Sequence, residues 1–298
     1  MKISAAERHF RDHLREIYSD GEASVIASML LENITGFSRS DLLLRKNDAL
    51  ADDQQLKLNE YVLRLRQHEP VQYVIGKAWF FGLEFFVDPS VLIPRPETEE
   101  LVRWIVDDVA ALHFDVFEQL PGQADKTKTL KILDVGTGSG CIALALKNEM
   151  PRAEVWGCDV SEKALNVARR NGSALNIRVD FQGVDFLNMS EQKSLPTVDI
   201  VVSNPPYVSK REMTHMQRNV VDHEPHVALF VPDEDPLIFY KALIAFGEHR
   251  LYENGIIYME IHESLGTEVK QLFSNANFFV ELRTDMQGKE RMVKATKL

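Results

Sequence analysis

From residue 130 onward, segments typical of strands alternate with segments typical of helices, and this alternation constrains the fold more than any other feature of the chain. The strand-like segments lie at 130–135, 153–159, 178–183, 198–203 and 255–261, and the helical stretches between them lie near 139–149, 161–175, 234–250 and 263–275. Such alternation is typical of a parallel sheet with helices on both faces. The last two segments, 278–285 and 290–297, are joined by a short turn and predict a closing antiparallel hairpin. We therefore expect an α/β domain with a mostly parallel, seven-stranded sheet.

The first 95 residues do not follow this alternation and predict two smaller parts. Residues 1–70 read as helices, with apolar residues such as Leu58 and Leu65 on one helical face. Residues 71–95 are rich in β-branched and aromatic side chains interrupted by glycines, which predicts a β-hairpin linker. The α/β domain would then occupy residues 96–298.

A helix is expected at the start of the α/β domain, over residues 96–112. Pro96 suits a first helical turn, and the acidic residues that follow it suit the helix dipole. Residues 113–129 are expected to form a polar loop, because they contain Pro121 and Gly122.

Composition and charge narrow the class of protein. Hydrophobic residues make up 45% of the 298, enough for a packed core, and no run of about 18 apolar residues predicts a membrane span. The charged N-terminal segment lacks the apolar core of an export signal, so we expect a cytoplasmic protein. The two cysteines, Cys141 and Cys158, suit free thiols in a reducing compartment.

The charge balance argues against nucleic-acid binding, and no metal site is expected. The net charge is −11, and the first 75 residues carry ten Lys and Arg against twelve Asp and Glu. Nucleic-acid binders normally present a basic face, although a local basic patch is compatible with a negative total. His223 and His226 flank Glu224, but this spacing is not the helical HExxH of zinc enzymes.

A glycine-rich turn follows the strand at 130–135 and opens the next helix. Glycine lets the backbone turn sharply and approach a ligand, and the helix start supplies free N–H groups. A dinucleotide loop has the spacing G-x-G-x-x-G, but Cys141 stands at the third glycine position. The G-x-G-x-G spacing, with Asp134 two residues ahead, is the version typical of S-adenosylmethionine; the alternative is a tight turn without a ligand. The predicted cofactor loop consists of Gly136, Thr137, Gly138, Ser139 and Gly140.

Two further strand ends complete this predicted cofactor site. Asp159 ends the next strand, where a carboxylate can accept hydrogen bonds from both ribose hydroxyls. Asp185 and Phe186 follow the third strand, where the carboxylate could take the exocyclic amine of adenine and the ring could pack on the base. Alternatively, Asp159 is a helix cap and Phe186 an ordinary core residue.

The segment Asn204-Pro205-Pro206-Tyr207 predicts the acceptor site, because it follows a strand that ends at the same edge as the glycine loop. An amide nitrogen is a poor nucleophile, because its lone pair is delocalised into the carbonyl. Hydrogen-bond acceptors aimed at its two N–H groups would hold the amide in place and raise the electron density on the nitrogen. The Asn204 side-chain oxygen and the Pro205 carbonyl are the natural pair, and Asn204 is expected to contact the cofactor as well. The prolines stiffen the loop, and Tyr207 can pack against a flat amide.

Catalysis by Asn204, Pro205 and Tyr207 would consist mainly of alignment. The sulfonium leaves as a neutral thioether, so the attack needs no strong base. Alignment can supply several kcal/mol, with about 7–11 kcal/mol as a ceiling. The alternative is a rigid Asn-Pro-Pro turn that carries no chemistry.

Taken together, these segments make the chain resemble the HemK/PrmC protein-glutamine N5-methyltransferases. The resemblance spans nearly the whole chain, and IPRPETE at 93–99 is its most specific element. The other matching segments are EPVQYVIG at 69–76, the loop at 134–140, Asp159, 185–186, 204–207, 224–225, 228–229 and 291–293.

The resemblance implies a Rossmann-like class I methyltransferase domain that uses S-adenosylmethionine. Its substrate would be the glutamine of the Gly-Gly-Gln loop in peptide chain release factors, with residues 1–70 for substrate recognition. The alternatives are a ribosomal-protein glutamine methyltransferase, an adenine-N6 methyltransferase that shares the NPPY signature, and a non-enzymatic scaffold.

Two positions depart from the family pattern. His262 follows Glu260-Ile261 where the family usually has glycine, and Phe186 stands where it often has tryptophan. Neither touches the proposed methyl transfer, but the first leaves the local loop geometry open.

Overall fold

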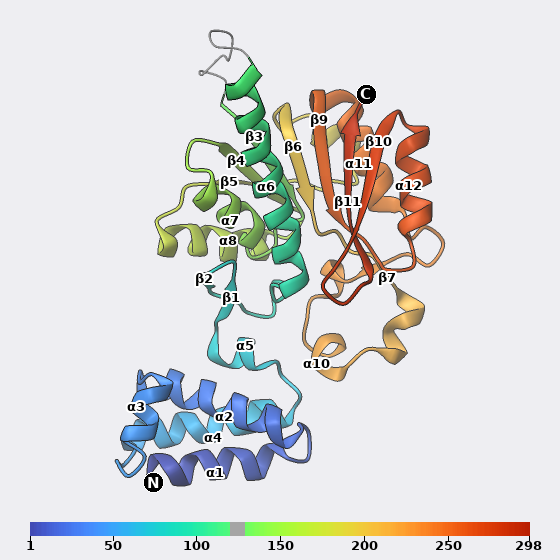
Figure 1. Ribbon diagram of the computed structural model, residues 1–298. Coiled ribbons are helices and arrows are strands. Elements are labelled where there is room, and N and C mark those ends of the chain that lie inside the picture. The colour runs from blue at the N-terminus through green and yellow to red at the C-terminus, as the bar shows by residue number, and fades with distance from the viewer. Residues whose placement is uncertain (120–128) are drawn as a thin grey trace. The chain divides into compact units, whose positions relative to one another are not determined.

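The computed structural model describes residues 1–119 and 129–298 (Figure 1). The chain divides into two compact units. The helical unit comprises residues 1–77 and 216–223, and the α/β unit comprises residues 78–215 and 224–298. In the described part of the chain, no helix is both long and apolar enough to cross a membrane.

The helical unit is a small bundle, as the sequence predicted. Its helices are α1 (Ile3–Leu14), α2 (Asp20–Thr35), α3 (Arg39–Leu44), α4 (Asp52–Arg66), α5 (Val71–Ile75) and α10 (Arg218–Val221). The predicted apolar face of α4, which includes Leu58 and Leu65, is buried in the core of the bundle. Ser19 and Ser38 cap α2 and α3, each through a reciprocal bond with an acidic residue three positions on.

The expected hairpin at 71–95 is wrong for residues 71–75, which form the helix α5. Helix α5 begins after Pro70 and ends at Gly76, whose φ of 69° closes it in a left-handed turn. The Arg64 guanidinium donates to the carbonyls of Tyr73 (3.1 Å) and Val74 (3.2 Å). These bonds satisfy the open end of the helix, so they override the strand preference of the sequence.

The hairpin itself is confirmed over a shorter range. Strands β1 (Ala78–Phe80) and β2 (Leu83–Phe85) pair antiparallel across a two-residue turn. Phe81 (φ 49°) and Gly82 (φ 77°) both take the positive φ that such tight turns require.

The seven-stranded sheet of the α/β unit confirms the predicted α/β class. Its order is β10-β11-β9-β6-β3-β4-β5, with only β11 antiparallel to its neighbours. The strands are β3 (Lys131–Val135), β4 (Glu154–Asp159), β5 (Asp180–Gly183), β6 (Val198–Ser203), β9 (Leu251–Glu260), β10 (Phe278–Thr284) and β11 (Glu290–Lys297). The short strands β7 (Val208–Ser209) and β8 (Phe230–Val231) pair separately.

Helices cover both faces of this sheet (Figure 1). Successive strand residues point to opposite faces, so Ile132 packs with one cluster and Leu133 with the other. The first cluster contains residues of α6 (Pro96–Gln119), α7 (Cys141–Glu149) and α8 (Glu162–Leu175). The second contains residues of α11 (Ile238–Arg250) and α12 (Gly266–Asn275). A short helix, α9 (Met189–Gln192), precedes β6.

Helix α6 is longer than predicted. It was expected to end near residue 112, but it continues to Gln119, so the predicted polar loop is wrong over 113–119. That stretch contains neither glycine nor proline, and the first helix breaker is Pro121. The rest of the predicted loop, 120–128, lies outside the described residues.

Candidate functional site

The candidate site lies where the strand order reverses. From β3 the chain continues to β4 on one side, and β6 pairs on the other side of β3, so the carboxyl ends of these strands border a crevice. A cavity of about 280 Å³ occupies this edge. It is lined by eight of the predicted site residues: Gly136, Gly138, Asp159, Asp185, Phe186, Asn204, Pro205 and Pro206. The other lining residues, which sequence reasoning did not assign to the site, include Ser90, Val91, Leu92, Val227, Ala228 and Phe239.

The glycine loop has the backbone form that its sequence predicts. Gly136, Gly138 and Gly140 all have positive φ, at 72°, 52° and 80°. A Cβ at Gly136 would meet no protein atom within 4 Å, whereas one at Gly140 would lie 3.1 Å from Ala168 and Phe181. Gly136 therefore leaves open space beside the cavity, and Gly140 lets α7 pack closely.

Three residues of the predicted loop do not line the cavity. Thr137 is buried and donates a 2.6 Å hydrogen bond to Asp134. Ser139 is buried as well, and its carbonyl accepts from the Asn171 amide at 2.9 Å. Together with Gly140 they shape the loop from behind, and their contact with a cofactor stays a prediction.

Asp134 is fully buried behind the loop. Its Oδ2 accepts from Thr137 and from the Ala143 N–H (3.2 Å), while Oδ1 has no hydrogen-bond partner among the described residues. Burial raises its pKa to about 7, although these two bonds favour the charged form. This carboxyl therefore titrates near neutral pH.

Asp159 is held at the cavity by two backbone groups. Oδ2 accepts from the Gly138 N–H (2.9 Å), and Oδ1 accepts from the Ser161 N–H (2.8 Å). The cap of α8 is Ser161, which accepts from Ala164, so the alternative of Asp159 as the cap residue is wrong. A carboxylate oxygen has a second lone pair, so Asp159 keeps acceptor capacity for a ligand.

Phe186 is both a core residue and a cavity residue. Its ring centroid lies 5.4 Å from that of Phe246, and the side chain is only 6% exposed. Neighbouring Asp185 accepts from the Leu187 N–H at 3.0 Å. Phe186 is thus a core residue at the wall of the cavity, and its packing on an adenine base stays a prediction.

The Asn204–Tyr207 segment leaves β6 beside the glycine loop. The Ser203 hydroxyl, at the end of β6, donates to the Val135 carbonyl (2.8 Å) and joins the two strand ends. Asn204 donates through Nδ2 to the Thr98 hydroxyl (3.0 Å), and Tyr207 donates to Glu260 (2.8 Å). Tyr207 does not line the cavity.

Tyr207 is not a base. Burial raises its pKa above the ordinary range, and the neighbouring Glu260 raises it further. The phenol therefore stays protonated and donates to Glu260. The ring of His262, the residue that departs from the family pattern, lies edge-on to Tyr207 at 6.1 Å.

The IPRPETE segment joins distant parts of the α/β unit. Arg95 forms a 2.5 Å ion pair with the buried Glu224, which also accepts from the Ile93 N–H (3.3 Å). Thr98 donates a 2.7 Å hydrogen bond to Glu260. Sequence reasoning found this motif but not the partners Glu224 and Glu260. The one available signal was an acidic residue at the end of the apolar strand 255–261.

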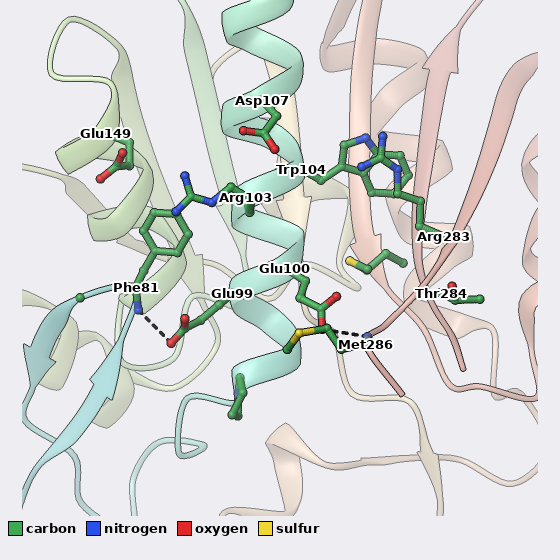
Figure 2. A pocket seen from close by; sticks show the side chains of 13 residues that line it. Phe81, Glu99, Glu100, Arg103, Trp104, Asp107, Glu149, Arg283, Thr284 and Met286 are labelled. Carbon is green, nitrogen blue, oxygen red and sulfur yellow. Dashed lines mark hydrogen bonds between the residues drawn. The ribbon is translucent and has the colours of Figure 1, made fainter. Parts of the chain in front are cut away.

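A second hollow of about 680 Å³ lies along α6, and no predicted site residue lines it (Figure 2). Figure 2 shows two carboxylates of α6 reaching to backbone N–H groups at this hollow. Glu99 accepts from Phe81 (3.0 Å) in the β1–β2 turn, and Glu100 accepts from Met286 (3.2 Å) in the β10–β11 turn. Glu99, the last residue of the motif, and Glu100, the residue after it, thus anchor two turns to α6.

Among the described residues, no group of three or more His, Cys, Asp or Glu is arranged to hold a metal ion.

Comparison with known proteins agrees with this architecture. Residues 5–76 match the PrmC N-terminal domain, and residues 109–226 match the methyltransferase small domain. The structure of the hMettl16 catalytic domain superposes with a TM-score of 0.53 at 17% identity, covering 83% of this chain and 82% of that one. At this identity the likeness concerns the fold alone.

Curated relatives match over nearly their whole length. The release factor glutamine methyltransferase of Flavobacterium psychrophilum is 37% identical over 99% of both chains. The enzyme of the same name from Bacteroides thetaiotaomicron is 37% identical over 97% of this chain and 98% of its own. Because these relatives match over nearly the whole chain, and the sheet and glycine loop agree with them, the chain belongs to the release factor glutamine methyltransferase family.

Proposed function

We propose that this protein transfers a methyl group from S-adenosylmethionine to the side-chain nitrogen N5 of the glutamine in the Gly-Gly-Gln motif of peptide chain release factors. The observation that carries the proposal is the position of Asn204 and Pro205 on the same cavity as the glycine loop. The full-length similarity to relatives named for this activity supports it. Release factors act on ribosomes, so we expect the reaction in the cytoplasm.

The cavity residues fit an adenosyl cofactor. Asp159 and Asp185 offer acceptors for hydroxyl and amine groups, and Phe186 offers a ring for a base. Gly136 and Gly138 leave the backbone open to close approach. When bound, S-adenosylmethionine supplies an electrophilic methyl group on a sulfonium, which leaves as a neutral thioether.

The acceptor amide is held by oxygen atoms of the Asn204–Tyr207 segment. The Asn204 Oδ1 and the Pro205 carbonyl accept hydrogen bonds from the two N–H groups of the glutamine amide. These bonds fix the plane of the amide and raise the electron density on its nitrogen. Neighbouring prolines keep these acceptors in place. Tyr207 remains protonated, so the residues contribute alignment rather than proton abstraction.

Protein recognition is assigned to the helical unit. Leu56 and Leu63, two turns apart on the same face of α4, are 72% and 63% exposed. Exposed apolar side chains on one helix face suit contact with a protein partner. The near-balanced charge of this region favours a protein substrate over nucleic acid.

The direct test is mass spectrometry of a release factor after incubation with the protein and S-adenosylmethionine. One added methyl group on the glutamine of the Gly-Gly-Gln loop is the expected product. Methylation of a ribosomal protein instead, with an unmodified release factor, would contradict the substrate assignment. A release factor with that glutamine replaced by asparagine is the matched control and should remain unmodified.

A further inference from the structure

We infer that Thr98 and Glu260 are positioning residues that set which way the Asn204 amide faces, and so aim its oxygen at the acceptor. The inference rests on the proposed function, because it assumes that Asn204 Oδ1 holds the substrate amide. Neither residue lines the cavity, so both act through Asn204 rather than on the substrate.

The observation is a continuous chain of hydrogen bonds behind the Asn204–Tyr207 segment. Asn204 Nδ2 lies 3.0 Å from Thr98 Oγ1, which lies 2.7 Å from Glu260 Oε2. The other oxygen of Glu260, Oε1, lies 2.8 Å from the Tyr207 hydroxyl. Thr98 and Glu260 thus connect the first and last residues of the segment through its buried side.

The direction of each bond follows from which group holds a proton. A carboxylate only accepts, so both hydroxyls must donate to Glu260. The Thr98 hydroxyl has one proton, and once it is given to Glu260, Thr98 can only accept from Asn204. Asn204 must therefore present its NH₂ group to Thr98, which leaves Oδ1 pointing to the opposite side of the amide.

The reversed amide would be unfavourable for a specific reason. With Oδ1 toward Thr98, two acceptors, Oδ1 and Glu260 Oε2, would compete for one hydroxyl proton. One of them would remain without a donor in a buried position, which costs free energy. The reversed amide would also present its NH₂ group, which cannot accept, to an N–H group of the substrate. Because Glu260 accepts the Thr98 proton, Thr98 must accept from Asn204, and this fixes the orientation of the Asn204 amide.

Burial raises the pKa of Glu260, and the two hydroxyl donors and the positive charge of Arg291 oppose this shift by stabilising the carboxylate. The side chain is 2% exposed, and both of its oxygens accept hydroxyl protons. The positive charge of Arg291 also favours the carboxylate. Arg291 itself faces Asp285 at 3.5 Å, so the buried charge belongs to a larger ionic cluster.

The test is a pair of substitutions at Thr98 in the full chain, assayed with S-adenosylmethionine and a release factor. Thr98→Val keeps the shape but removes the hydroxyl, whereas Thr98→Ser keeps the hydroxyl and is the matched control. We expect Thr98→Val to lower kcat by about 10- to 100-fold, the scale for a misplaced polar group at a reacting centre. Thr98→Ser should restore kcat to near the wild-type value, and calorimetry should show unchanged cofactor affinity for both.

The outcomes separate this inference from the proposed function. Equal kcat for Thr98→Val and Thr98→Ser, while Asn204→Ala is inactive, would overturn the positioning role and leave the proposed function standing. An active Asn204→Ala would overturn the role of Asn204 in holding the acceptor amide, and the positioning role with it, whereas a wild type that leaves the release factor unmethylated would overturn the proposed function. If thermal unfolding shows that Thr98→Val does not fold, Thr98→Ala takes its place, and wild-type kcat in that variant would equally reject the positioning role.

Discussion

The Gly138 N–H donates a 2.9 Å hydrogen bond to the Asp159 carboxylate, which ties the glycine loop to the end of the neighbouring strand. The same carboxylate lines the cavity and is our proposed acceptor for the ribose hydroxyls. Replacement of Asp159 therefore removes both a loop contact and a ligand contact.

Asp159→Ala should weaken the binding of S-adenosylmethionine by about 1–3 kcal/mol, the range for a lost hydrogen bond to a charged group. Calorimetry with the wild type and the variant measures this loss. NAD is the negative control, because Cys141 occupies the position where a dinucleotide loop has glycine. Tight NAD binding without a response to S-adenosylmethionine would contradict the cofactor assignment.

Asn204→Ala should abolish methyl transfer and leave cofactor affinity nearly unchanged. The Asn204 side chain holds the acceptor amide, and the polar contacts proposed for the cofactor come mainly from Asp159 and Asp185, so the expected contact of Asn204 with the cofactor contributes little to its binding. Turnover of the release factor and calorimetry of the cofactor give the two readouts. Asn204→Asp is a matched variant of equal size. It too should be slow, because aspartate lacks the NH₂ group that donates a hydrogen bond to Thr98. Substantial turnover by Asn204→Ala would reduce Asn204 to a turn residue.

The rate of methyl transfer should depend on the ionisation of Glu260. Burial raises the pKa of this carboxyl, so its charged form is lost at a higher pH than for an exposed glutamate. The charged and titratable groups that face it are Glu97, Tyr207, Tyr240 and Arg291. As pH falls, kcat of the wild type should decline, whereas Glu260→Gln should have a lower kcat without this acid limb. Parallel pH profiles for the two proteins would count against the role of Glu260.

Asp134 should make the folded state less stable as pH rises. Burial raises its pKa from 3.8 to about 7, so the folded chain binds this proton more tightly than the unfolded chain. The contribution is most favourable below the unfolded-state pKa and is lost as pH rises to about 7. Melting temperatures from about pH 4 to pH 8 should therefore fall more steeply for the wild type than for Asp134→Asn. Equal slopes would show that Asp134 does not titrate in this range.

The double substitution Leu56→Ser with Leu63→Ser should raise KM for the release factor while kcat and cofactor affinity stay the same. Both leucines are exposed on α4 of the helical unit, so their replacement costs little stability. Phe279→Ser on β10 of the α/β unit, where the side chain is 57% exposed, is the control and should leave KM unchanged. An unaltered KM in the double variant would remove this face of α4 from the recognition surface.

The parts of the site that sequence reasoning located are local in the chain. The glycine loop is one turn between a strand and a helix, and Asn204–Tyr207 directly follows a strand. Residue type and spacing are enough to identify such turns, because the carboxyl ends of parallel strands share an edge. The same reasoning gave the order of strands and helices from residue 130, although β9 begins at Leu251 rather than near residue 255.

The contacts that sequence reasoning missed join residues far apart in the chain. Thr98 lies 106 residues from Asn204 and 162 residues from Glu260, and no spacing rule predicts such pairs. Helix α5 was missed for a related reason. The Arg64 side chain that completes it lies outside the segment whose local preference suggested a strand.

The place of β11 in the sheet has a consequence for how the protein is made. β11 follows all other strands in the sequence, yet it lies between β9 and β10, antiparallel to both. A nascent chain that has not reached residue 290 therefore holds β9 and β10 with their facing backbone edges unpaired. Unpaired strand edges invite association with other chains. The pairing of the sheet can be completed only after Glu290–Lys297 has been synthesised. This half of the domain therefore completes its folding late, when β11 pairs between β9 and β10.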